Sequence, residues 1–100
     1  MLIVLAEADL GADALVEGHD AFAAMVAASR AEEGCLGYSY ATDILDRSKF
    51  IIVEKWADQA ALDHHFATPH MAAFQRALQD IDVKITHLAK YQADDGSPLM

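Results

Sequence analysis

The order of its strand-like and helix-like segments constrains the fold of this chain more than any other feature. An alanine-rich segment, 13–33, predicts a helix closed by Gly34, and a second helical region runs over 58–66 and restarts at Thr68 and Pro69. Four short apolar or alternating segments predict strands: 2–8, 36–42, 50–56 and 83–91. This order predicts an α+β, ferredoxin-like (split βαβ) fold with an antiparallel sheet and both helical regions on one face.

Apolar periodicity also predicts which side chains each element buries. In the first helix, the residues that recur at three- and four-residue steps are Leu15, His19, Phe22 and Val26. In the second strand, three large side chains alternate with small ones and are expected on one face: Leu36, Tyr38 and Tyr40. Both sets are predicted to face the core.

Two predicted strands are apolar on both faces, and one face of the sheet has no helix to cover it. The opposed pairs are Leu2 and Val4 against Ile3 and Leu5, and Phe50 and Ile52 against Ile51 and Val53. Leaving such a side chain in water forgoes roughly 1.5 to 3 kcal/mol, and monomers rarely expose large apolar patches. The sequence therefore predicts a homodimer whose sheets pack face to face as a dimeric α+β barrel.

Length and charge narrow the class of protein. One hundred residues predict one domain, 1–92, followed by a flexible C-terminal tail, 93–100. The formal net charge of -9 argues against binding to nucleic acid or to an anionic membrane surface, because both attract clustered basic side chains. The single cysteine, Cys35, cannot form an intrachain disulfide, and the N-terminal residues lack the pattern of a signal or membrane-spanning segment. The expected location is the cytoplasm.

Most of the groups that can exchange protons near neutral pH lie within residues 54–70. His65 and His70 flank the expected helix break, so either could lie at the mouth of a cavity and act as a general base. A hydrogen-bonded histidine at a helix end explains each of them equally well. His64 is expected to point the other way. Together with Asp63, these histidines lack the ligand spacing of a metal site, and no metal is predicted.

Aromatic and carboxyl groups nearby are candidates for contact with a flat ligand. Trp56 offers a stacking surface, and Glu54 beside it is either a carboxylate with a raised pKa or an edge carboxylate paired with a basic side chain. Tyr38 and Tyr40 could hydrogen-bond a phenolic or quinone oxygen, although ordinary packing accounts for both. No serine lies in the elbow motif of a hydrolase nucleophile, so covalent hydrolysis is not indicated.

Three segments, 32–38 (EEGCLGY), 50–56 (FIIVEKW) and 60–70 (AALDHHFATPH), follow one another in a recognisable order. In this order they resemble the antibiotic biosynthesis monooxygenase domain family, which includes the quinol monooxygenases. The resemblance covers nearly the whole chain. It implies a dimeric α+β barrel that oxygenates a small aromatic substrate, such as a quinol, an anthrone or a polycyclic phenol, with O2 and without metal, flavin or haem.

The resemblance also implies roles for individual side chains. One of two histidines, His65 or His70, would accept a proton from the substrate. The electron-rich anion would then pass an electron to O2, and the radical pair would recombine to a hydroperoxide that collapses to a quinone and water. The remaining side chains would surround the substrate: Tyr38, Glu54 and Trp56 as orienting groups, and Phe66 and Phe74 as apolar walls.

Two alternatives to this activity stay open. A haem-degrading branch of similar fold depends on an Asn, Trp and His set, and at the matching positions this chain carries Glu7, His65 and Gln75. Haem degradation is therefore disfavoured, and a haem-binding relative is kept as an alternative. The other alternative is a non-catalytic binder of a hydrophobic aromatic metabolite, because the resemblance specifies the fold more strongly than the activity.

Overall fold

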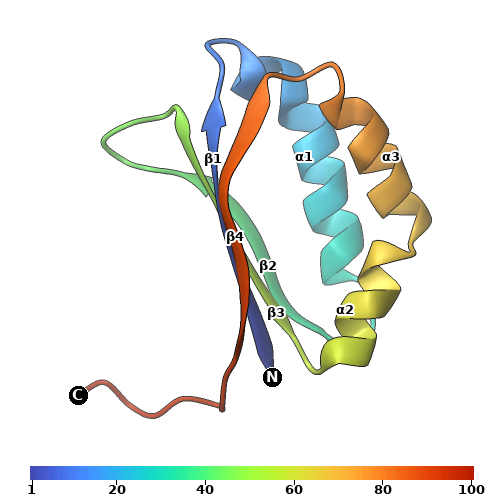
Figure 1. Cartoon of the computed structure of the whole chain (residues 1–100), viewed down its shortest axis with the longest axis vertical. Coiled ribbons are helices and arrows are strands. Elements are labelled where there is room, and N and C mark those ends of the chain that lie inside the picture. Colours follow the sequence, from blue (N-terminus) through green and yellow to red (C-terminus); the bar gives the residue numbers. More distant parts are fainter.

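The computed structural model describes all 100 residues as a four-stranded antiparallel sheet with three helices on one of its faces (Figure 1). The strands follow one another across the sheet in the order β2-β3-β1-β4. In chain order the elements are β1 (Leu2–Leu10), α1 (Ala14–Arg30), β2 (Cys35–Thr42), β3 (Lys49–Trp56), α2 (Gln59–Phe66), α3 (Pro69–Leu78) and β4 (Val83–Gln92). The predicted ferredoxin-like α+β fold is confirmed.

Side-chain caps set the break between α2 and α3, as the sequence predicts. The carboxylate of Asp58 accepts a hydrogen bond from the backbone N–H of Ala61 at 2.9 Å and starts α2. The hydroxyl of Thr68 accepts one from Met71 N–H at 3.2 Å, and Pro69 occupies the first turn of α3. The break therefore places the end of α2 and the start of α3 side by side.

Helix α1 ends at Arg30, three residues before the predicted end, and residues 31–34 form a turn into β2. Gly34 has a φ of 85°, and a Cβ at this position would lie 2.6 Å from the Cβ of Ala61. Only glycine accepts both the left-handed backbone and this close approach without strain. As a consequence, Glu32 lies in the turn rather than in the helix.

The buried face of α1 differs from the predicted one. The residues that α1 buries are Ala14, Gly18, Phe22, Met25 and Ser29, so Phe22 is the one member of the predicted stripe that is buried. Most of the residues on this face are small, which lets α1 lie close to the sheet. The larger side chains of the predicted stripe lie beside this buried face, and one of them, His19, is largely exposed.

The start of β2 also departs from the prediction. The register between β2 and β3 shifts between Cys35 and Gly37, as in a β-bulge, which adds one residue to the strand. Leu36 is therefore 57% exposed, whereas Tyr38 is 3% exposed and belongs to the core. The alternation of Tyr38 and Tyr40 holds, and the expectation that Leu36 shares their face is wrong.

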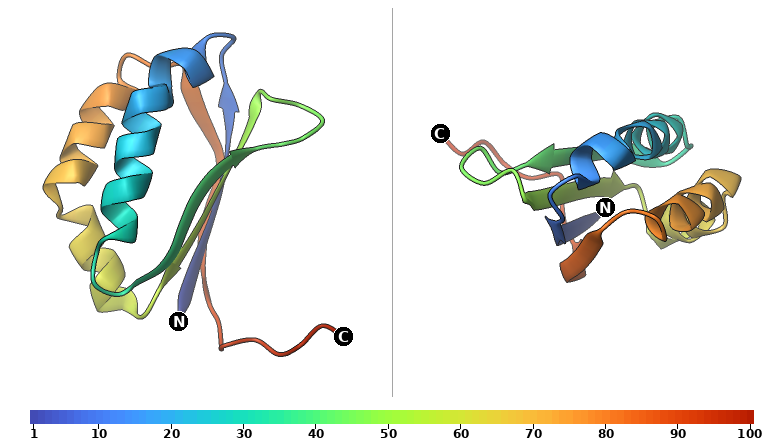
Figure 2. Two further views of the ribbon diagram at one scale, coloured as in Figure 1. Left: turned by 180° about the vertical axis from the view of Figure 1, so that it is seen from behind. Right: turned by 90° about the horizontal axis from the view of Figure 1, so that it is seen from above.

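The face of the sheet opposite the helices carries no other element (Figure 2). By strand register it includes Ile3, Leu5, Ile51, Val53 and Tyr91. Leu5 is 38% and Tyr91 45% exposed. This is the face predicted to meet a second copy of the chain. Residues 93–100 contain no helix or strand, and none of the helices has the length and apolar character needed to cross a membrane.

Candidate functional site

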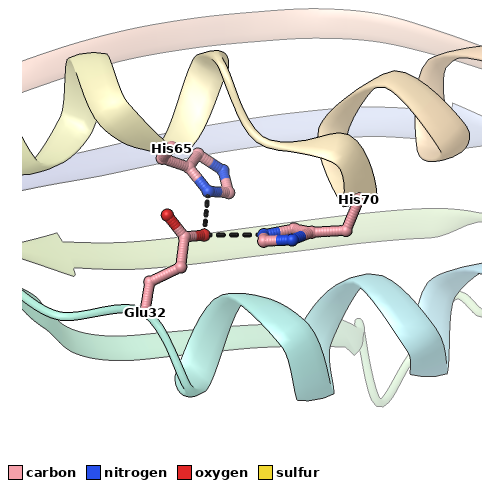
Figure 3. Close-up of side chains that lie close together, drawn as sticks. All are labelled: Glu32, His65 and His70. Carbon is pink, nitrogen blue, oxygen red and sulfur yellow. Dashed lines mark hydrogen bonds and ion pairs between the residues drawn. The ribbon is translucent and has the colours of Figure 1, made fainter.

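Glu32, His65 and His70 meet where the turn after α1 lies against the break between α2 and α3 (Figure 3). Nδ1 of His65 lies 2.6 Å from Oε2 of Glu32, and Nε2 of His70 lies 2.8 Å from the same oxygen. A carboxylate only accepts hydrogen bonds, so each ring donates its N–H to Glu32. In the neutral rings, Nε2 of His65 and Nδ1 of His70 are therefore the nitrogens that carry a lone pair. We call these three residues the Glu32 cluster.

Access to the two imidazoles of the Glu32 cluster differs. The exposed fractions of the side chains are 5% for Glu32, 1% for His65 and 25% for His70. Oε1 of Glu32 and Nε2 of His65 are buried without a hydrogen-bond partner. Two charge-assisted hydrogen bonds offset part of the cost of burying the carboxylate. Within the cluster, His70 is the side chain that a molecule from solvent can reach.

Glu54 and Trp56 lie beside the cluster and bind one another. The indole N–H of Trp56 donates to Oε1 of Glu54 at 3.0 Å, and the Trp56 ring lies with its centroid 4.5 Å from that of His65. Burial raises the pKa of the Glu54 carboxyl, and the Trp56 hydrogen bond partly opposes this rise. Glu54 forms no ion pair, so of the two interpretations of this residue the structure favours the carboxylate with a raised pKa.

Tyr38 and Tyr40 on β2 form a hydroxyl pair that joins the buried core to the α1 side of the sheet. Their phenolic oxygens lie 2.9 Å apart. The ring of Tyr38 contacts that of His65, with centroids 5.5 Å apart, and burial raises the pKa of both phenols, so both stay protonated at neutral pH. The Tyr38–Tyr40 hydrogen bond is not continued to the Glu32 cluster, which the Tyr38 ring meets only through the ring of His65.

The two phenylalanines predicted as apolar walls lie in different surroundings. Phe74 packs against Phe22 and Tyr40, with ring centroids 6.1 and 6.0 Å away, and shares a small hollow between α1 and α3 with His70. Phe66 lies near the His65 ring but is 59% exposed at the end of α2. Of the two, Phe74 is the one placed against the aromatic core.

The largest cleft lies apart from the cluster, between α1 and the β2–β3 side of the sheet, and has a volume of about 540 Å³. We call it the α1 cleft. Neither His65 nor His70 lines it. Eight of its eleven lining residues are hydrophobic, and the main ones are Leu15, Phe22, Val26, Tyr40 and Phe50, with Arg30 at the end of α1. The stripe predicted as the buried face of α1 is thus a wall of this cleft.

The Glu32 cluster is also the place where this chain could hold a metal ion. Each member offers one ligand atom, and these atoms lie within 4.8 Å of one another. Two histidines and a carboxylate are a known ligand set for zinc and iron. Here the three atoms are already joined by N–H···O hydrogen bonds, so an ion would have to displace two protons. Sequence spacing misses the set because Glu32 lies 33 and 38 residues from the two histidines.

A family model described as antibiotic biosynthesis monooxygenase matches residues 1–77. The probable quinol monooxygenase YgiN of Escherichia coli K12 is 34% identical over 68 residues, which are 60% of this chain and 65% of that protein. The uncharacterized protein sll1783 of Synechocystis is 36% identical over 69 residues, 64% of this chain and 47% of its own length. The chain thus spans about half to two thirds of the length of these two relatives.

Solved structures share the fold over nearly the whole chain. A Deinococcus radiodurans protein, provisionally assigned as an antibiotic biosynthesis monooxygenase, has a TM-score of 0.89 at 25% identity, covering 100% of this chain and 99% of that one. The protein PA3566 of Pseudomonas aeruginosa has a TM-score of 0.75 at 33% identity, covering 92% and 94%. The likeness therefore extends through β4, beyond the residues that the family model matches.

Proposed function

Because this chain belongs to the antibiotic biosynthesis monooxygenase family, we propose that it is a cofactor-independent monooxygenase that oxidises a quinol, an anthrone or a polycyclic phenol with O2. The observation that carries the proposal is the α1 cleft, lined by Phe22, Tyr40 and Phe50. Its volume of about 540 Å³ falls within the range of small-molecule sites. Similarity to a protein named as a probable quinol monooxygenase supports a hydroxylated aromatic substrate.

The proposed reaction needs no reductant other than the substrate. A base removes a proton from the hydroxyl group or an activated C–H, and the anion passes one electron to O2. Recombination of the two radicals forms a carbon–oxygen bond, and the hydroperoxide loses water to leave a carbonyl group. For an anthrone, a CH2 group and O2 become C=O and H2O, so one oxygen atom enters the product and the other leaves as water.

A histidine of the Glu32 cluster is the proposed proton acceptor, and His70 is the better placed of the two. Its side chain is 25% exposed, against 1% for His65, and its Nδ1 is not used in the bond to Glu32. Tyr40 lines the α1 cleft, and its hydroxyl bonds that of Tyr38, whose ring contacts His65. No hydrogen bond joins either hydroxyl to the Glu32 cluster, so the substrate or a water molecule would have to reach the partly exposed His70 ring for the proton to be transferred.

The other predicted site residues keep indirect roles in this proposal. Glu54 and Trp56 bind each other beneath the helices, so they would orient His65 and Tyr38 rather than touch the substrate. Phe74 would support the wall formed by Phe22 and Tyr40. None of the five orienting and wall residues lines the α1 cleft itself, and Phe66 lies exposed at the end of α2.

Oxygen uptake with a menadiol-like quinol or an anthrone tests the activity, with autoxidation of the substrate alone as the blank. His70→Ala should slow uptake by about 10²- to 10⁴-fold, the usual contribution of a general base. His64→Ala is the matched control, since His64 is exposed on α2 outside the cluster. Uptake no faster than autoxidation contradicts the activity, and equal rates in the two variants remove His70 from the mechanism.

The distance between the α1 cleft and the imidazoles favours a second candidate function, a non-catalytic binder of an aromatic metabolite. Neither histidine of the cluster lines the cleft, so binding there needs no proton acceptor. The same experiment separates the two functions. With a binder, the fluorescence of an aromatic ligand would change on titration, and O2 would be consumed no faster than by autoxidation.

We propose that the active form is a homodimer joined through the bare face of the sheet. The apolar residues of that face, among them Leu5 and Tyr91, support a partner that covers them. Light scattering at micromolar concentration should give twice the chain mass of 10.9 kDa. Leu5→Glu should give a monomer, whereas Val16→Glu, on the exposed side of α1, should not. A wild-type monomer would contradict the proposal.

A further inference from the structure

The lining of the α1 cleft differs in charge from the rest of the molecule. The chain has 16 acidic and 7 basic residues, yet no carboxylate lines this cleft. The two lining residues with basic side chains are Arg30 and His19. An acidic protein that keeps its acidic groups out of its largest apolar cleft offers a local environment suited to a negatively charged ligand.

Arg30 is held at one end of the cleft with donors to spare. Its Nε donates to the backbone carbonyl of Tyr38 at 2.7 Å, and the side chain forms no ion pair. A guanidinium has five N–H donors, so the terminal nitrogens keep donors for a planar, doubly accepting group. The carbonyl end of α1 carries roughly half a negative charge. The full positive charge of Arg30 is larger, so this end of the cleft stays positive.

His19 is the other basic side chain of the lining, nearer the N-terminal end of α1, and is electrically weaker. It lies eleven residues before Arg30 on α1, about 16 Å along the helix axis at 1.5 Å per residue. Nδ1 of His19 is 3.1 Å from a carboxylate oxygen of the exposed Asp20, which offsets any positive charge on the ring. The cleft therefore has one cationic end, at Arg30, and an apolar body that includes Phe22, Tyr40 and Phe50.

We infer that the α1 cleft binds an aromatic ligand carrying an anionic oxygen, a phenolate or a carboxylate, with this oxygen at Arg30 and the ring against Phe22, Tyr40 and Phe50. The inference rests on the proposed function in taking this cleft as the substrate site, and it narrows the substrate to aromatic compounds that place an anionic oxygen at the Arg30 end of the cleft. Pairing with Arg30 stabilises the anion that forms when a phenol loses its proton, so the same contact that selects the ligand favours the first chemical step.

Binding of a charged and a neutral probe of equal size tests this inference without any turnover. Calorimetric titration of the wild-type chain should give tighter binding of 2-naphthoate than of 2-naphthalenemethanol. Arg30→Gln should weaken naphthoate binding by about tenfold, the effect of losing one charge-assisted contact, and leave the neutral probe within about twofold. Arg76→Gln is the matched control, because Arg76 is an exposed arginine in the last turn of α3.

A second measurement keeps the test valid if Arg30→Gln disturbs the turn after α1. Added salt should weaken naphthoate binding to the wild type and leave the neutral probe unaffected, and Arg30→Lys should retain part of the preference. Equal affinity of the two probes, no binding of either, or an equal effect of Arg76→Gln overturns the inference. Arg30-dependent binding without O2 uptake contradicts the proposed oxygenase activity alone.

Discussion

The Glu32 cluster and the α1 cleft are two regions with opposite properties. The cluster concentrates a carboxylate and two imidazoles in a space that is almost closed, with His65 1% exposed. The cleft offers about 540 Å³ but few polar groups. Between them lie the Tyr38–Tyr40 hydroxyl pair and the contact of Phe22 with Phe74. Residues with the chemistry of a general base thus need not lie where a substrate fits.

The difference has a structural cause. Glu32 belongs to the turn after α1, His65 to the end of α2 and His70 to the start of α3, so the cluster joins three segments that are distant in sequence (Figure 3). The α1 cleft, in contrast, exists because the helices leave part of the β2–β3 side of the sheet open. We therefore expect substitutions in the cluster to change the stability of the fold, and substitutions in the cleft to change ligand binding.

The largest expected effect is a loss of stability on substitution of Glu32, the acceptor shared by both histidines of the cluster. Glu32→Ala leaves the ring N–H of the buried His65 without an acceptor, at a cost of about 1 to 3 kcal/mol, and removes the charge-assisted hydrogen bond of the partly exposed His70. We expect the free energy of unfolding to fall by about 2 to 4 kcal/mol, measured by urea denaturation at one protein concentration. Glu33→Ala, an exposed neighbour in the same turn, is the control and should change little. Equal effects of the two substitutions would show that the cluster does not stabilise the fold.

A second prediction concerns the α1 cleft, where a substitution should weaken ligand binding and leave the free energy of unfolding almost unchanged. Ala23 lines the α1 cleft and is exposed, so Ala23→Leu should fill the cleft and weaken binding of a naphthyl probe by at least about tenfold, or 1.4 kcal/mol. The free energy of unfolding should stay within about 0.5 kcal/mol of wild type. Ala24→Leu is the control, because Ala24 faces the hollow between α1 and α3. If Ala24→Leu weakens binding as much as Ala23→Leu, the ligand lies elsewhere.

The same contrast explains which features the sequence could predict. Strand and helix order and the caps Asp58 and Thr68 follow from local chemistry and are present. Gly34 has the expected left-handed backbone, although it lies beyond the end of α1 and does not cap it. The bulge in β2 and the early end of α1 depend on how the chain packs, and local patterns do not reveal them.

The site was predicted in part for the same reason. His65, His70 and Trp56 lie close together along the chain and also in space. Glu32 joins them from a distant turn, and the acidic pair just before Gly34 was the available signal for it. The α1 cleft was missed because Leu15 and Val26 have the periodicity of core residues while lining a cavity.

The smallest predicted effect lies at Glu54, the acidic group between the two regions. Burial raises its pKa, and its charge adds a smaller contribution to the rise that burial causes in the pKa of Tyr38 and Tyr40. A raised carboxyl pKa means that the folded state holds this proton more tightly than the unfolded state. Its contribution to stability is therefore full below the unfolded value of about 4.3 and is lost as pH rises through the folded value.

Glu54→Gln should remove the loss of stability that accompanies ionisation of the Glu54 carboxyl as pH rises. The amide oxygen of glutamine can still accept the hydrogen bond from the Trp56 indole, so the packing is kept while the buried charge is removed. We expect the variant to be at least as stable as wild type at pH 7 and the difference between them to shrink toward pH 4, measured by urea denaturation across this range. Glu33→Gln, at an exposed site, should show no such trend. If Glu54→Gln is less stable than wild type at pH 7, then the charged carboxylate stabilises the folded state, and the predicted loss of stability from its burial is wrong.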